Sequence, residues 1–222
     1  SSDQKTKDST KRFFKTAVKT HGVKSKLVGQ ISKEAIKELS DSTKDITFSI
    51  AEDLFKSGYC EEAWVAASLV LSKKDSFTKS DFKVFERWID TYIDDWAKCD
   101  VFCNHTMWAL LEKYPEFIEN LKKWAKSPNM WMKRAAAVSL IIPAKNGEYL
   151  KQSFELADIL LLDKEDLVQK GYGWLLKEQS RKNQKAVYDY VVKHKKEMPR
   201  TALRYAIELM PENLRKLAMA KD

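Results

Sequence analysis

Residues 61–71 have the sequence EEAWVAASLVL, and this stretch decides the fold class. Two glutamates at its start suit the N-terminus of a helix, where the helix dipole favours acidic side chains. The rest of the stretch is almost entirely apolar, so we expect a helix that other elements cover on several sides.

The chain on both sides of this stretch is typical of helices joined by short connections. Residues 24–39 carry apolar side chains at every third or fourth position, which places them on one face of a helix. Breaks are expected at Ser57-Gly58, at Tyr114-Pro115 and near Pro143. The expected helices are residues 11–20, 24–39, 46–56, 61–71, 82–92, 104–113, 116–126, 131–142, 149–162, 166–180, 186–195 and 201–210.

Composition excludes the main alternatives to a helical fold. The 222 residues include only 6 Gly and 5 Pro, too few for the many tight turns of a strand-rich sandwich or barrel. No GxGxxG or GxxxxGK[ST] motif is present, which excludes these glycine-rich phosphate loops. We therefore expect an all-α protein, either a compact bundle or an α-solenoid of antiparallel helix pairs with a HEAT-like period of about 40 residues. We expect one domain over residues 1–222, with residues 1–10 as a poorly ordered tail.

Three cysteines do not form a paired disulfide framework, and no run of 18 apolar residues or signal-peptide core is present. These features predict an intracellular protein without a membrane span, located in the cytoplasm or on the nucleoid, or in the nucleus if the source is eukaryotic.

The charge of the chain is uneven. The formal net charge is +8, but residues 1–44 and residues 181–222 each hold 11 basic and 5 acidic residues, whereas the middle is net acidic. Basic ends of this kind are typical of proteins that bind a polyanion such as nucleic acid. Ordinary solvated helix faces would give the same counts, so charge alone leaves both interpretations open.

Three short patterns contain candidate functional residues. Trp96 and Asp100 are four positions apart in DDWAKCD, which places them side by side on a helix. Arg134 begins the apolar part of NMWMKRAAA, and Trp174 follows two glycines in QKGYGWLL. Each has a structural alternative: Asp100 as a helix cap, Arg134 as a partner of a carboxylate, and Trp174 as a core residue.

Two further clusters suggest metal binding, but weakly. Cys99, Cys103 and His105 supply at most three ligands, and buried thiols are the simpler interpretation. An acidic cluster recurs at helical spacing, but a solvated helix face or a run of acids that stabilises a helix dipole is the simpler interpretation. We expect no metal and no cofactor. The acidic cluster comprises Asp90, Asp94, Asp95 and Asp100.

Over nearly its whole length the chain resembles the AlkD family of DNA alkylation repair glycosylases. The most specific matches are W-x-x-x-D at 96–100, then W-x-x-R-A-A from 131, then Q-K-x-x-G-W ending at 174. The resemblance implies a HEAT-like superhelix with a concave DNA-binding face, and duplex DNA containing alkylated purines as the partner of a monomer. It also implies that capture of the base in a deep pocket is not required.

The resemblance implies a role for each matching residue. Asp100 matches the catalytic carboxylate, Trp96 and Trp174 match the aromatic walls beside it, and Arg134 matches an arginine that contacts the DNA backbone. Phe13 falls where relatives carry an aromatic residue. Further DNA contacts are expected from Lys24, Lys133, Lys170, Arg200 and Arg204. The sequence departs from the family at Leu167 and at Gly171-Tyr172.

The implied chemistry suits these residue types. A purine alkylated at N3 or N7 is positively charged and leaves without protonation, so the two carboxylates of ordinary glycoside hydrolysis are not needed. One ionised carboxylate, Asp100, would stabilise the developing oxocarbenium ion and orient a water molecule. Two alternatives remain open: a non-catalytic helical-repeat module that binds nucleic acid or protein, and a weaker one, a metal-dependent hydrolase built on the acidic cluster.

Overall fold

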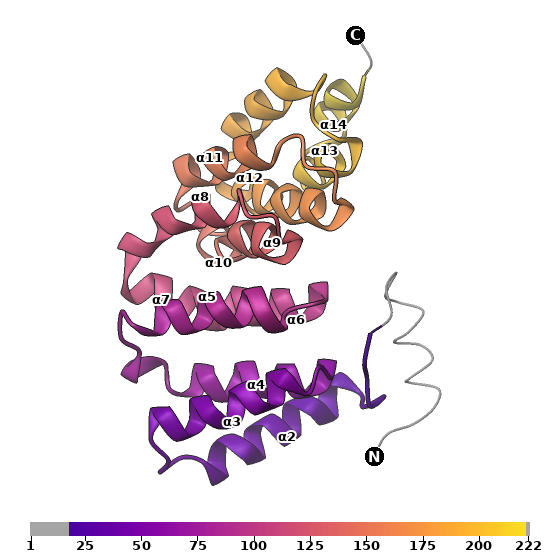
Figure 1. Ribbon diagram of the computed structural model, residues 1–222. Coiled ribbons are helices and arrows are strands. Elements are labelled where there is room, and N and C mark those ends of the chain that lie inside the picture. The colour runs from indigo at the N-terminus through magenta and orange to yellow at the C-terminus, as the bar shows by residue number, and fades with distance from the viewer. Residues whose placement is uncertain (1–17, 221–222) are drawn as a thin grey trace. The chain divides into compact units, whose positions relative to one another are not determined.

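The computed structural model describes residues 18–220, and it contains helices and turns but no strand in that range (Figure 1). The chain divides into two compact units, residues 1–114 and residues 115–222. Each unit is a stack of packed helices, which confirms the all-α prediction and the α-solenoid fold. The organisation as one domain stays a prediction. None of the helices in residues 18–220 is both long enough and apolar enough to span a bilayer.

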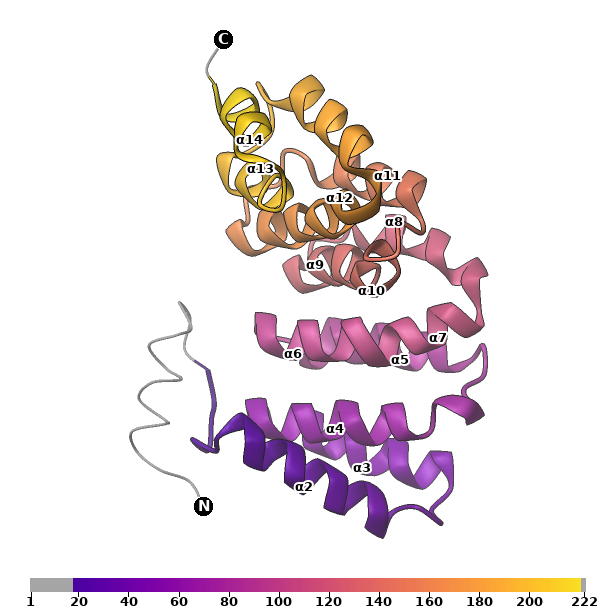
Figure 2. The same cartoon turned by 180° about the vertical axis from the view of Figure 1, so that it is seen from behind.

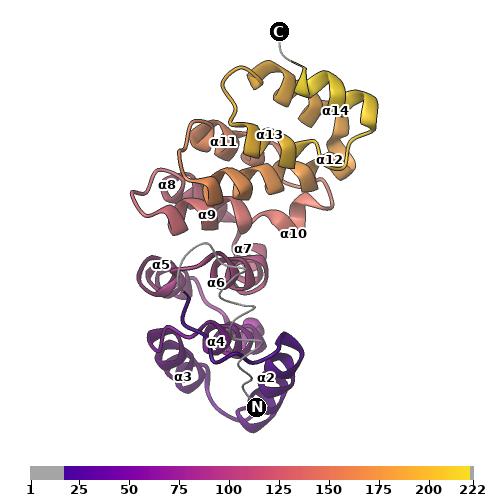
Figure 3. The same ribbon diagram turned by 90° about the vertical axis from the view of Figure 1, so that its right-hand side faces the viewer.

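Helix α4 is the centre of the first unit. It packs against α2, α3, α6 and the π-helical turn η2, and Figure 3 shows the helices of this unit roughly end-on. Ala66 and Val70 of α4 are fully buried. Cover on several sides is what the apolar sequence of residues 61–71 predicted. The elements of this unit are α2 (Ser25–Glu38), α3 (Lys44–Lys56), α4 (Cys60–Ser72), η1 (Lys74–Ser76), α5 (Asp81–Tyr92), α6 (Trp96–Val101), η2 (Phe102–Met107) and α7 (Trp108–Lys113).

Aromatic rings fill the space between α3, α5 and η2. The ring of Phe85 lies 5.3 Å from that of Phe102 at an interplanar angle of 82°, and Phe55 meets Phe102 in the same edge-on manner at 5.6 Å. Trp88 is 1% exposed and packs on Phe55 and Phe85. Edge-to-face pairs add about 0.5–1.5 kcal/mol each to the gain from burial. This rigid cluster supports the segment that follows Asp100.

The helix that carries Asp100 begins earlier than its apolar pattern indicates. The sequence predicted a helix over residues 104–113, but helical structure runs from Trp96 to Lys113 through α6, η2 and α7. Its start is set by Asp95, whose extended backbone and side chain cap α6. The turn η2 is a π-helix, a rare form that is frequent at functional sites.

Helix α12 is the centre of the second unit. It packs against α9, α10, α11, α13 and α14, as Figure 2 shows from behind. The sequence predicted separate helices at 166–180 and 186–195, and the structure agrees: α12 consists of two helices that meet at a kink at Asn183, whose backbone is not helical. The elements of this unit are η3 (Pro115–Asn120), α8 (Leu121–Trp124), α9 (Met130–Val138), α10 (Ile141–Ala144), α11 (Leu150–Leu160), α12 (Asp166–His194), α13 (Arg200–Ala206) and α14 (Glu212–Met219).

Candidate functional site

Trp96 and Asp100 lie on the outer face of α6. Both are partly exposed, whereas the three residues between them, Ala97, Lys98 and Cys99, are buried at 4%, 3% and 0% exposure. One helical turn separates the two, so the indole and the carboxylate project from the same face. The arrangement predicted from the W-x-x-x-D spacing is therefore present.

The Trp96 side chain packs against a small apolar cluster. Cys60 and Ala97 form the buried part of this cluster, and Val18 and Trp64 pack on it beside Trp96. Burial of one face restrains the indole while part of the ring stays accessible to solvent. A partly exposed, restrained indole can pack against a flat or cationic group.

The start of α6 is anchored by a buried ion pair that was not predicted. Asp95, 1% exposed, accepts a 2.9 Å hydrogen bond from the backbone N–H of Lys98. The ammonium of Lys98 donates to the carbonyl of Gly58 at 2.7 Å and to Asp94 at 2.6 Å, and lies 3.6 Å from Asp95. Burial raises the pKa of Asp95, and the Lys98 N–H and charge oppose that rise. These contacts fix the helix that carries Asp100 to the loop before α4.

The same geometry assigns a structural role to part of the acidic cluster. Asp94 and Asp95 are engaged with Lys98, and residues 18–220 contain no group of three or more His, Cys, Asp or Glu side chains arranged to hold a metal ion. The cysteines, as expected, are buried thiols, and burial raises the pKa of Cys60 to about 12. The sequence did carry a signal for this role. Aspartate is a preferred N-cap residue, and Asp95 directly precedes α6.

Arg134 belongs to α9 in the second unit and is 5% exposed. Its Nη1 donates a 2.5 Å hydrogen bond to the carbonyl oxygen of Leu167 in α12. A Cβ atom on Gly171 would lie 3.4 Å from Cγ of Arg134, an ordinary van der Waals distance, so this glycine packs directly beside the arginine stem. The departures from the family pattern at Leu167 and Gly171 thus lie directly against Arg134. The following residue, Tyr172, is buried and donates from its hydroxyl to the carbonyl of Leu161.

Trp174 lies on α12 with its ring partly exposed and its indole N–H bound to Glu178. The Nε1–Oε1 distance is 3.0 Å, and the second oxygen of Glu178 accepts a 2.5 Å bond from Nε of Arg181. Burial alone raises the pKa of Glu178, but the bonds from Arg181 and Trp174 outweigh it, and the pKa falls below its ordinary value. The ionised carboxylate fixes the ring of Trp174.

Two of the lysines expected to contact DNA are engaged in ion pairs. Lys133 lies 2.6 Å from Asp163, and Lys170 lies 2.8 Å from Asp166. Both lysine side chains keep some solvent access, at 21% and 27% exposed. Lys24 is exposed and stands at the N-cap of α2. Phe13, the remaining candidate of the first unit, lies outside the described residues.

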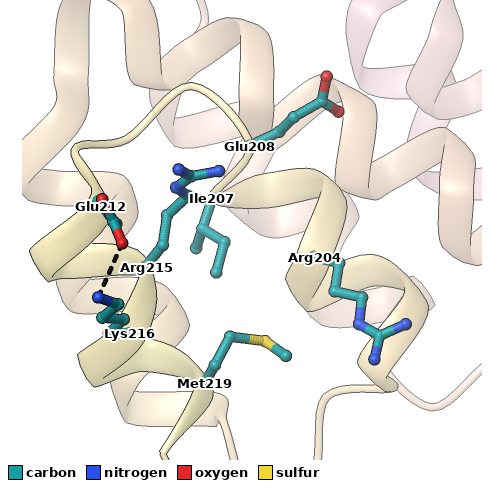
Figure 4. A pocket seen from close by; sticks show the side chains of 7 residues that line it. All are labelled: Arg204, Ile207, Glu208, Glu212, Arg215, Lys216 and Met219. Carbon is teal, nitrogen blue, oxygen red and sulfur yellow. Dashed lines mark ion pairs between the residues drawn. The ribbon is translucent and has the colours of Figure 1, made fainter.

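The C-terminal arginines lie on α13. Arg200 donates from Nη2 to the carbonyl of Met219 at 3.2 Å. Arg204 is exposed and lines a shallow pocket of about 340 Å³ between α13 and α14 (Figure 4). Figure 4 places Ile207 and Met219 between Arg204 and Arg215. The pocket therefore combines an apolar floor with basic groups at its edges. Its lining is Arg204, Ile207, Glu208, Glu212, Arg215, Lys216 and Met219.

The segment before α2 is held by a buried carboxylate that was missed. Glu61, 9% exposed, accepts bonds at 2.6 Å from the hydroxyl of Thr20, at 3.1 Å from the backbone of His21, and at 3.0 and 3.1 Å from the backbone of Gly22 and Val23. Burial raises the pKa of Glu61, but these hydrogen bonds outweigh it and the pKa lies below its ordinary value. The sequence offered one sign of this role, because Glu61 is an acid in the first turn of an otherwise apolar helix.

The comparisons with known proteins agree with this architecture. A solved structure described as a predicted DNA alkylation repair enzyme from Enterococcus faecalis matches with a TM-score of 0.85 and 16% sequence identity, over 95% of this chain and 97% of that one. At that identity the match shows a shared fold. No curated protein matches the chain. The model of the DNA alkylation repair enzyme family matches residues 1–210, and the chain therefore belongs to the DNA alkylation repair enzyme family.

Proposed function

We propose that this protein is a DNA glycosylase that hydrolyses the N-glycosidic bond of positively charged N3- or N7-alkylated purines in duplex DNA. Membership of the family gives a role in DNA repair. The glycosylase chemistry is supported by one observation above all: Trp96 and Asp100 share the exposed face of a helix whose intervening residues are buried.

The proposed mechanism uses Asp100 as an ionised carboxylate. As the bond to the cationic base breaks, positive charge develops on the sugar, and a carboxylate beside it lowers the free energy of that state. The same carboxylate orients a water molecule for attack at the anomeric carbon. No general acid is required, because an alkylated base departs as a neutral molecule. Hydrolysis then leaves an abasic site and a free purine.

The tryptophans are proposed to contact the lesion or its sugar through their ring faces. A cation over an indole gains about 0.5–2 kcal/mol, and more when water is excluded. Restraint of the ring makes this contact less costly in conformational entropy. Trp96 is restrained by the cluster around Cys60, and Trp174 by its bond to Glu178.

Basic side chains are proposed to bind the DNA backbone. Arg134, fixed by the carbonyl of Leu167, would contribute positive charge near the lesion. The ion pairs of Lys133 and Lys170 are accessible to solvent, so phosphates can compete with the carboxylates for these lysines. Further contacts are assigned to Phe13, Lys24, Arg200 and Arg204. We propose that the protein acts as an intracellular monomer.

The charge of the lesion provides the test. Duplex DNA with one 7-methylguanine, which is cationic, is compared with the same duplex carrying hypoxanthine, which is neutral, and the free bases are measured by chromatography. We expect release of 7-methylguanine and no release of hypoxanthine above the rate without protein. Binding to both duplexes without release of either base would instead support the non-catalytic binding module.

A further inference from the structure

The carboxylate of Glu178 joins a tryptophan to an arginine on one face of α12. One oxygen accepts the indole N–H of Trp174, and the other accepts Nε–H of Arg181. The Glu178 side chain is 4% exposed, whereas that of Arg181 is 46% exposed. The acid therefore lies under the surface and the arginine rises from it.

The geometry leaves the outer part of the guanidinium available. Arginine carries five N–H donors, and only the one on Nε is used by Glu178. Within residues 18–220, neither Nη1 nor Nη2 of Arg181 has a hydrogen-bond partner. A guanidinium held by its inner edge presents two parallel N–H donors outward, which is the geometry that binds a phosphate with two bonds.

A neighbouring loop and α12 itself add positively charged side chains near Arg181. The loop between α10 and α11 packs on α12: Nδ2 of Asn183 donates to the carbonyl of Gly147 at 3.1 Å. Beside this contact, Lys182 and Lys145 are exposed, and Lys145 is close enough to Glu178 to lower its pKa. The exposed acid of this loop is Glu148, which accepts a bond from Asn146.

We propose that Arg181 binds a backbone phosphate of DNA, and that Glu178 is the positioning residue that holds Arg181 and Trp174 in register. This inference rests on the proposed function for its choice of ligand, since a phosphodiester is the anion that repeats along that substrate. In this proposal Glu178 does not contact the DNA. It acts by holding the side chains of Trp174 and Arg181 in place.

The first test is the salt dependence of binding to an undamaged duplex, followed by fluorescence anisotropy. In Arg181→Gln we expect the slope of log Kd against log salt concentration to fall by about 0.9, the value for one lost phosphate contact, and the affinity at moderate salt to fall about 3- to 10-fold. The matched control is Lys185→Gln, which removes the same charge just beyond the kink of α12, at a side chain that is 87% exposed and paired with Asp189. Equal slopes for the two variants would overturn the proposal.

The second test is Glu178→Gln, which separates positioning from simple charge. Removal of an acid near DNA strengthens binding if charge alone matters. If Glu178 holds Arg181 and Trp174 together, the glutamine amide can accept only one of the two hydrogen bonds and places a donor against the other partner, and we expect the affinity to fall at least about threefold. A tighter complex in Glu178→Gln would overturn the positioning role, and thermal melting confirms that the variant is folded.

Both tests use intact DNA and no base release, so they are independent of the catalytic proposal. If Arg181→Gln has the wild-type slope of log Kd against log salt concentration while the protein releases the base, the phosphate site is rejected and the glycosylase proposal stands. If Arg181→Gln has a smaller slope but the wild-type protein releases no base, the phosphate site stands and the glycosylase proposal is rejected.

Discussion

Asp95 and Lys98 lock the first turn of the helix that carries Asp100. The Asp95 carboxylate accepts the backbone N–H of Lys98 at 2.9 Å, and both side chains are at least 97% buried. In Asp95→Ala the cap is lost and a buried ammonium loses a neighbouring charge. We expect the free energy of unfolding to fall by about 2–4 kcal/mol. Urea denaturation monitored by circular dichroism measures this loss.

The control for that substitution is Asp94→Ala. Asp94 also pairs with Lys98, but its side chain is 69% exposed and water replaces it. We expect a loss below about 1 kcal/mol. Equal losses in the two variants would show that the cap and burial of Asp95 are unimportant.

Glu61 gives the stability of the first unit a specific pH dependence. Its pKa is lowered in the folded state, so its contribution is fully present above the unfolded pKa of about 4.3 and is lost as the pH falls through the folded value. In Glu61→Gln we expect lower stability at pH 7 and a flatter decline in acid. Thermal melting between pH 3 and 7 checks this, with exposed Glu34→Gln as the control. Parallel curves for wild type and Glu61→Gln would contradict the role assigned to Glu61.

Two helical glycines are expected to respond in opposite directions to alanine. A Cβ on Gly173 would lie 2.9 Å from the carbonyl oxygen of Ala202 and 2.8 Å from Cβ of Tyr205, so Gly173→Ala forces α12 and α13 apart. We expect a loss of about 1–3 kcal/mol. A Cβ on Gly29 meets nothing within 4 Å, so Gly29→Ala should stabilise by about 0.5–1 kcal/mol. Chemical denaturation of both variants gives the comparison, and stabilisation by Gly173→Ala would show that the contact is loose.

The sequence was sufficient for the helical fold because apolar spacing reports burial directly. Residues 63–71 are almost all apolar, and α4 is indeed covered by several neighbours. Helix ends were harder to predict. Pro143 was expected to end a helix, but it lies inside the short helix α10, and α14 was not expected because its eight residues were placed after the boundary at Pro211.

At the candidate site, too, some features were predictable from the sequence and others were not. The spacing of Trp96 and Asp100 was enough to predict a shared helix face. The buried contacts that anchor α6 and the segment before α2 were not predictable, because the hydrogen bonds from Lys98 to Gly58 and from Thr20 to Glu61 join residues about 40 positions apart. Glu178 was within reach, since its spacing of four from Trp174 and three from Arg181 is the spacing of neighbours on a helix.

The single-turnover rate of 7-methylguanine release from a defined duplex decides whether Asp100 is the catalytic carboxylate. The comparison is between wild type, Asp100→Asn and Asp75→Asn, which alters an exposed carboxylate of the same unit. Asparagine keeps the shape of Asp100 but removes the charge that stabilises the developing oxocarbenium ion. We expect the rate to fall at least about 100-fold in Asp100→Asn and to stay unchanged in Asp75→Asn. A rate for Asp100→Asn within a few-fold of wild type would show that Asp100 is not the catalytic group.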